Sequence, residues 1–233
     1  AISKMEINGK IVVITGASAG LGKALARIFV REKAIVVVSS NSGEELKNSA
    51  VETGAVPFVA DVTKESNMDN LAEFAVEKFG RIDIWINNAG ITGPHSEIEE
   101  IDMKEAHKVM EVNLFGTVYG SRAAMRFMKK QKSGAIVNIV SASALAGRPR
   151  SAIYSSSKWA ARGFTEALKL ALEPKGVSVI AVYPGGIKTG LFGERKPVEY
   201  DTYMEPEYVA GKIIENLKLE NPEKDLIIKS ENY

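Results

Sequence analysis

The feature that most constrains the fold is an alternation, kept up along the chain, between short β-branched runs and segments of helical periodicity. Apolar runs this short and continuous are typical of strands that are buried on both faces. They lie at residues 10–14, 34–38, 56–59, 82–86, 135–140, 177–183 and 225–228. The sequence therefore predicts about seven strands.

Between these runs the apolar residues recur at helical spacing, as Leu21, Leu25 and Phe29 do in the first segment. Helices are expected at about 20–31, 64–79, 102–131, 154–173 and 206–219. Parallel strands need crossover connections, and right-handed crossovers place helices on both faces of the sheet. The chain is predicted to be an α/β protein with one open, doubly wound (Rossmann) parallel sheet, because a barrel needs eight strand-helix units.

Because one open sheet accounts for all the predicted strands, we expect a single domain over residues 1–233, and its composition is that of an ordinary globular protein. Thirty Lys and Arg balance 29 Asp and Glu, and 45% of residues are hydrophobic, which excludes intrinsic disorder. With no Cys and two His, Cys-based zinc sites, thiol catalysis and disulfides are excluded, and no metal site is predicted. The balanced charge argues against a nucleic-acid partner.

No apolar stretch approaches the roughly 20 residues that a membrane-spanning helix needs, so no membrane partner is expected. The first residues carry Lys4, Glu6 and Lys10 and have no apolar core like that of a signal peptide. We expect a cytoplasmic protein.

A glycine-rich turn, TGASAGLG at residues 15–22, follows the first strand directly and leads into a helix. Glycines let the backbone approach a pyrophosphate, and the start of a helix offers free N–H groups and positive charge. The spacing differs from G-x-G-x-x-G, and the absence of G-K-[ST] excludes a nucleoside-triphosphatase loop. The turn predicts a dinucleotide site.

Tyr154 and Lys158 lie four residues apart, so they share one face of the helix predicted there. A phenol has an ordinary pKa of about 10, and a nearby ammonium group favours the phenolate and lowers that pKa. Ser141 comes at the end of the fifth predicted strand, where its hydroxyl could bond to a substrate carbonyl oxygen. Together these residues predict acid-base chemistry on an oxygen atom.

Further motifs complete a set that runs in order from residue 15 to residue 189. They are the 15–22 turn, Asn87-Asn88-Ala89-Gly90, Asn113 in VNLFG, Ser141, Tyr154 with Lys158, and Pro184-Gly185 with Thr189. This set resembles that of the classical short-chain dehydrogenase/reductase (SDR) family. The resemblance implies an NAD(P)(H)-dependent oxidoreductase that transfers a hydride between the nicotinamide and a carbonyl or alcohol substrate.

The resemblance also implies a role for each catalytic residue. Tyr154 is the general acid/base on the substrate oxygen, and Lys158 lowers its pKa and holds the nicotinamide ribose. Ser141 steadies the reacting oxygen, and Asn113 positions a water that links Lys158 to solvent.

Cofactor contacts follow from the same resemblance. Asp61 matches the position that binds the adenine amino group, the 88–90 segment lines the adenosine ribose, and Thr189 contacts the carboxamide. The full predicted set is Gly16, Ser18, Ala19, Gly20, Leu21, Gly22, Ser40, Asn41, Asp61, Val62, Asn88, Ala89, Gly90, Tyr154, Lys158, Pro184, Gly185, Ile187 and Thr189.

The choice between NADP and NAD depends on the end of the second strand. Enzymes that use NAD usually place an acid there for the ribose 2′-OH, and a basic residue there suits a 2′-phosphate. This chain has Ser40 and Asn41, which carry no charge but can hydrogen-bond a phosphate. NADP(H) is therefore favoured, and NAD(H) stays possible.

The segment at 185–203 is rich in Gly and Pro and follows the sixth strand, so a substrate lid is expected there. The helices at 102–131 and 154–173 could pair subunits, and a homodimer or homotetramer acting on a small molecule is predicted. The alternative function is a dinucleotide-binding sensor or scaffold without catalysis, although such a protein has no need of Ser141.

Overall fold

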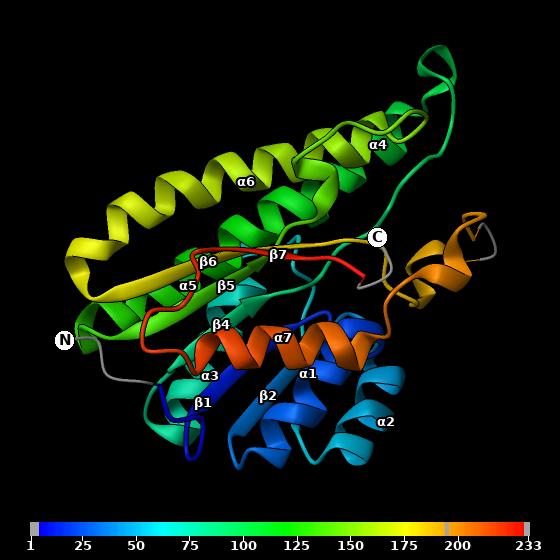
Figure 1. The fold of residues 1–233 in the computed structure, drawn as a ribbon. Coiled ribbons are helices and arrows are strands. Elements are labelled where there is room, and N and C mark those ends of the chain that lie inside the picture. The colour runs from blue at the N-terminus through cyan, green and yellow to red at the C-terminus, as the bar shows by residue number, and fades with distance from the viewer. Residues whose placement is uncertain (1–4, 194–195, 231–233) are drawn as a thin grey trace.

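The computed structural model describes residues 5–193 and 196–230. Their strands form one seven-stranded sheet in the order β3-β2-β1-β4-β5-β6-β7 (Figure 1), and every neighbouring pair is parallel. The strands are β1 (Ile11–Thr15), β2 (Ile35–Ser40), β3 (Val56–Val59), β4 (Ile84–Asn87), β5 (Gly134–Ile139), β6 (Val177–Pro184) and β7 (Asp225–Ile228). The predicted Rossmann sheet is confirmed, and its order reverses between β1 and β4, where α/β sheets of this kind bind ligands.

Helices cover both faces of the sheet (Figure 1). They are α1 (Gly20–Arg31), α2 (Gly43–Thr53), α3 (Glu65–Phe79), α4 (Met103–Met110), α5 (Gly116–Gln131), α6 (Ala152–Leu172) and α7 (Pro206–Leu217). Apolar side chains of α1, α2 and α7 pack on one face, and those of α3, α5 and α6 pack on the other. None of the helices in the described ranges is long and apolar enough to cross a membrane.

Strand β1 shows why its apolar run is continuous. Val12 and Ile14 belong to the core under α1, whereas Val13 belongs to the core on the opposite face. All three side chains are fully buried. Successive strand residues point to opposite faces, so a strand covered by helices on both sides needs apolar residues at every position.

The helix α2 is absent from the sequence-based prediction. Its only buried positions are Leu46, Ser49, Ala50 and Thr53, so its apolar face is short and half polar. The helix ends at Gly54, which adopts the left-handed conformation with φ of 77°. Helices often end at such a glycine, and this residue was the one local feature of the sequence that could have indicated the helix.

The single helix predicted at 102–131 is interrupted. A π-helical turn, Glu111–Phe115, separates α4 from α5. Such turns are rare and occur frequently at functional sites. This one carries Asn113, which is buried.

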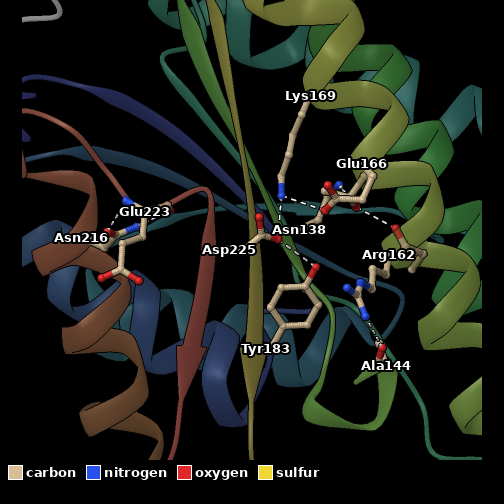
Figure 2. A network of polar contacts seen from close by, with 11 residues as sticks. Asn138, Ala144, Arg162, Glu166, Lys169, Tyr183, Asn216, Glu223 and Asp225 are labelled. Carbon is tan, nitrogen blue, oxygen red and sulfur yellow. Dashed lines mark hydrogen bonds and ion pairs between the residues drawn. The ribbon is translucent and has the colours of Figure 1, made fainter. Parts of the chain in front are cut away.

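Polar contacts attach the edge strand β7 to the rest of the domain (Figure 2). The Asp225 carboxylate accepts hydrogen bonds from Lys169 Nζ at 2.7 Å and from the Tyr183 hydroxyl at 3.0 Å. Burial raises the pKa of Asp225, but the bond and charge of Lys169 bring it below its ordinary value. At the preceding turn, Asn216 Nδ2 donates to the Glu223 carbonyl at 3.0 Å, and Glu223 N donates to Asn216 Oδ1 at 2.9 Å. These bonds tie β7 to α6, β6 and α7.

Candidate active site

The glycine turn after β1 is packed so closely that side chains are excluded. Gly16 has φ of 65°, and a Cβ there would lie 2.6 Å from the Ala89 Cα. A Cβ on Gly22 would lie 2.4 Å from the Gly16 carbonyl oxygen. The two glycines therefore let the turn pack tightly against itself and against residues 88–89 at the start of α1, where free backbone N–H groups would suit a pyrophosphate.

The turn is fastened to the segment after β4. Asn88 Nδ2 donates to the carbonyl oxygens of Thr15 and Gly16, each at 2.9 Å. Thr15 Oγ1 accepts from the backbone N–H of Asn88 at 3.1 Å and of Ala89 at 3.3 Å. The sequence-based prediction included Thr15 in the turn but assigned it no role. Its position at the end of the first strand could have indicated one.

Polar, uncharged side chains gather at the end of β2. Ser40 Oγ donates to Ser18 Oγ at 3.2 Å and accepts from Ser42 N at 3.3 Å. Asn41 is exposed, and α2 begins after Ser42, whose side chain makes no capping bond. This end of the strand lies beside the glycine turn, to which the Ser40–Ser18 hydrogen bond joins it.

After β3, the Asp61 carboxylate is oriented by its own turn. Asp61 Oδ1 accepts from Thr63 N at 2.9 Å and from Thr63 Oγ1 at 2.8 Å. Val62 is buried beneath it, and a Cβ on Gly116 would lie 2.9 Å from Val62 Cγ2. The position of Asp61 is thus fixed by backbone geometry and by packing.

The segment that follows β6 returns across the start of α1. Pro184 ends the strand, and the Gly185 N–H donates to a β7 carbonyl at 2.9 Å. Ile187 forms a parallel bridge to the segment just before α7. A Cβ on Gly20 would lie 3.1 Å from Thr189 Cγ2, which brings Thr189 against the glycine turn.

Tyr154 and Lys158 lie on the first turns of α6, with Lys158 Nζ 5.8 Å from the centre of the Tyr154 ring. Lys158 is 5% exposed, and its Nζ donates to the Ile139 carbonyl at the end of β5 at 3.1 Å. Ser141 follows that strand end, and its Oγ accepts from Ser143 N at 3.1 Å. The helix and the strand end therefore converge on one place.

Asn113 fastens the π-helical turn to two other parts of the site. Its amide exchanges two hydrogen bonds with the backbone of Ile91, each at 2.9 Å, and donates to Ser157 Oγ at 3.0 Å. Ser157 Oγ in turn donates to the Tyr154 carbonyl at 2.7 Å. A Cβ on Gly90 would lie 3.3 Å from Asn113 Oδ1 and 3.5 Å from Lys158 Nζ. Sequence reasoning missed Ser157, one of several serines in a row without a distinguishing local pattern.

The environment shifts the pKa of both helix residues. Burial raises the pKa of Tyr154, although a hydrogen bond with Ser141 and the positive charge of Arg148 oppose the rise. Burial lowers the pKa of Lys158 to about 8. The net direction for the pKa of Tyr154 is upward because desolvation outweighs the influences that lower it, and the phenolate-favouring role of Lys158 stays a prediction. At neutral pH the phenol is protonated and most of the Lys158 amine is charged.

Comparison with known proteins finds relatives that belong to one family. The family model described as short chain dehydrogenase matches residues 10–199. The uncharacterized oxidoreductase YxnA of Bacillus subtilis (strain 168) is 32% identical, covering 97% of this chain and 67% of that protein. Glucose 1-dehydrogenase 2 of the same organism is 36% identical, covering 79% of this chain and 74% of that protein.

Solved structures agree with the sequence comparison. The alcohol dehydrogenase from the archaeon Thermococcus sibiricus, complexed with 5-hydroxy-NADP, superposes with a TM-score of 0.87 at 28% identity, covering 97% of this chain and 98% of that one. The 3-ketoacyl-(acyl-carrier-protein) reductase from Brucella melitensis, complexed with NADH, gives a TM-score of 0.90 at 26% identity with the same coverage. The chain belongs to the short-chain dehydrogenase family of oxidoreductases.

Proposed function

We propose that this protein is an NAD(P)(H)-dependent oxidoreductase that interconverts a carbonyl compound and its alcohol. The observation that carries the proposal is the convergence of Tyr154, Lys158 and Ser141 at the end of β5. The glycine turn that fits a pyrophosphate lies at the same edge of the sheet. A bound nicotinamide would supply or accept the hydride at the carbonyl carbon.

The chain's own residues would manage the proton and the charge on the substrate oxygen. The Tyr154 hydroxyl, which hydrogen-bonds with Ser141, would act as the general acid during reduction by giving its proton to the substrate oxygen. Ser141 Oγ can orient the substrate oxygen. The Lys158 ammonium, held by the Ile139 carbonyl, would stabilise negative charge on the phenol once its proton has left.

To test this proposal, the protein is mixed with NADPH or NADH and with each member of a panel of ketones, aldehydes and diketones. The reaction is followed by the absorbance of the cofactor. We expect oxidation of the cofactor with at least one member of the panel. Tight cofactor binding without any turnover would instead support the alternative, a sensor or scaffold that only binds the dinucleotide.

We propose further that NADP(H) is preferred, with NAD(H) as the possible alternative. The end of β2 carries no carboxylate that would repel a 2′-phosphate, and Ser40, Asn41 and Ser42 offer hydrogen bonds. The positive end of α2 begins beside them. Among the structural neighbours, one is complexed with an NADP derivative and others with NADH or NAD.

Ser40→Asp is expected to shift the NADPH/NADH ratio of kcat/KM toward NADH by about 10- to 100-fold. The new carboxylate would repel the phosphate and accept a bond from the ribose hydroxyl, a charge-assisted contact of about 1.5–3 kcal/mol. Ser40→Asn is the matched control, because it adds similar bulk without the charge. If both variants keep the wild-type ratio, the adenosine ribose does not lie at the end of β2.

The segment 185–203 is proposed as a lid over the substrate; residues 194 and 195 lie outside the described ranges. Its base is fixed through Ile187, whereas its tip touches the segment after β4, where Thr92 Oγ1 donates to the Leu191 carbonyl at 3.4 Å. Leu191 is 39% exposed and is thus available to cover a substrate. This long hydrogen bond at an exposed tip is easily opened.

Hydrogen exchange of the Gly190–Gly193 amides tests this lid. These amides should exchange fast in the free protein and markedly more slowly when cofactor and a substrate analogue are both bound, because closure would exclude water. Amides of β1 serve as the internal control, since the strand is buried in both states. Equal exchange with and without ligands would make the segment an ordinary connection.

We still predict that the protein acts on a small molecule, that it is located in the cytoplasm, and that it forms a homodimer or a homotetramer. Light scattering on the eluting protein would determine the oligomeric state.

A further inference from the structure

Two cationic side chains on consecutive turns of α6 bind the backbone on either side of Ser141. Lys158 Nζ donates to the Ile139 carbonyl at 3.1 Å, two residues before Ser141. Arg162 follows Lys158 by one helical turn, so the two side chains lie on the same face of α6. Its Nη1 donates to the Ala144 carbonyl at 3.0 Å, three residues after Ser141 (Figure 2). The helix that carries the reacting phenol therefore holds the chain both before and after Ser141.

The carbonyl that Arg162 binds belongs to the short turn that orients the Ser141 hydroxyl. This turn is the 3₁₀ segment Ala142–Ala144, which Ser141 caps. Ala144 N donates to the Ser141 carbonyl at 3.0 Å, and Ser143 N donates to Ser141 Oγ at 3.1 Å. Because Ser141 Oγ accepts from Ser143, its own proton is available for donation to another oxygen. A displacement of the turn would therefore displace the hydroxyl.

The guanidinium of Arg162 is itself held in place. Its Cζ lies 5.5 Å from the centre of the Trp159 ring and 5.8 Å from the centre of the Tyr183 ring, distances at which a cation is attracted to an aromatic ring. The Tyr183 ring is fixed in turn, because its hydroxyl donates to Asp225 at 3.0 Å (Figure 2). Arg162 is thus a fixed link between α6 and the turn.

We propose that Arg162 is a positioning residue, which holds the Ser141 hydroxyl at the correct place relative to the Tyr154 hydroxyl. This inference rests on the proposed carbonyl chemistry and adds a residue to its site. In that chemistry both hydroxyls meet at one substrate oxygen, although Ser141 follows β5 and Tyr154 lies on α6. Small misplacements of reacting groups lower the rate strongly. Lys158 fixes the helix to the strand before Ser141, and Arg162 fixes it to the turn after Ser141.

Arg162→Met tests this link, because methionine keeps an apolar side chain beside Trp159 but cannot donate to the Ala144 carbonyl. We expect kcat to fall by about 10-fold, while KM and the dissociation constant of the cofactor stay within about twofold of the wild-type values. Arg162→Lys restores an N–H donor and should recover part of the loss. The matched control is Arg126→Met, the same change on α5, where Arg126 pairs with Asp69 at 2.9 Å. This control should leave kcat unchanged.

A double-mutant comparison separates positioning of Ser141 from a general structural defect. Ser141→Ala removes the hydroxyl that the turn orients. In that background Arg162→Met should lower kcat by less than about twofold, because the two residues act through one contact. A further loss of about 10-fold in the Ser141→Ala background would mean that Arg162 acts independently of Ser141, and would overturn the inference.

Hydrogen exchange in the free protein separates failure of this inference from failure of the proposed function. The Ser143 and Ala144 amides should exchange at least about fivefold faster in Arg162→Met than in the wild type, because their turn loses its attachment to α6. The Val140 amide, which donates to the Val182 carbonyl at 2.8 Å, is the internal control. Faster exchange in a protein that turns over no carbonyl compound supports the link and contradicts the proposed reaction. Turnover with unchanged exchange and unchanged kcat in Arg162→Met supports the reaction and overturns the link.

Discussion

Tyr154→Phe is expected to lower kcat/KM for every carbonyl substrate by about 10²–10⁴-fold, the usual contribution of a positioned general acid. The substitution removes only the hydroxyl, so the ring stays beside Lys158, whose Nζ lies 5.8 Å from its centre. Lys158 also keeps its bond to the Ile139 carbonyl. The dissociation constant of the cofactor should therefore stay within about twofold of the wild-type value, as expected for loss of one hydrogen-bonding group outside the pyrophosphate cradle.

Turnover is measured by cofactor absorbance and affinity by titration of the free protein with NADPH. Tyr119→Phe, on α5, is the control for loss of a phenolic hydroxyl elsewhere. If Tyr154→Phe keeps more than a tenth of wild-type activity, Tyr154 does not supply the proton.

Gly120→Ala is expected to lower the free energy of unfolding by about 2–5 kcal/mol, through overpacking and the loss of a buried hydrogen bond. A Cβ there would lie 2.1 Å from Asn87 Oδ1 and 2.9 Å from Trp85 Nε1. Trp85 Nε1 donates to Asn87 Oδ1 at 2.8 Å, and Asn87 Nδ2 continues the chain to Asn138 at 2.8 Å. All of these side chains are buried, so water cannot replace the bonds that a methyl group would disrupt.

Urea unfolding measures the effect, with Gly163→Ala as the matched control. Gly163 lies in the interior of α6, is exposed, and has nothing within 4 Å of a new Cβ. Alanine is the better helix former, so Gly163→Ala should stabilise the protein by roughly 0.5–1 kcal/mol. If Gly120→Ala also stabilises the protein, the buried hydrogen-bond network can shift without lowering the free energy of unfolding.

The inner strands could be predicted from the sequence because burial on both faces favours continuous apolar runs, as at 11–14 in β1 and 179–183 in β6. Helix α2 could not, because Leu46 is the one large apolar residue among its four buried positions. Its existence depends on packing against the sheet rather than on its own periodicity.

In the candidate site, too, some features could be predicted from the sequence and others could not. Tyr154 and Lys158 could be paired from sequence because four residues along a helix bring two side chains together. The bonds of Asn113 to Ile91 and Ser157 join segments that are far apart in the sequence. The direction of the Tyr154 pKa depends on burial, which the spacing of residues along the sequence does not reveal.

The outer position of β3 bears on how the folded protein avoids aggregation. An edge strand leaves one row of backbone groups open to strands of other molecules. Within the described residues, β3 pairs only with β2, and it carries an exposed proline, Pro57, at its second position. Proline has no N–H to offer and is tolerated in sheets at such edges. The strand is also only four residues long, so this side of the sheet is a poor template for adding a strand from a neighbouring molecule.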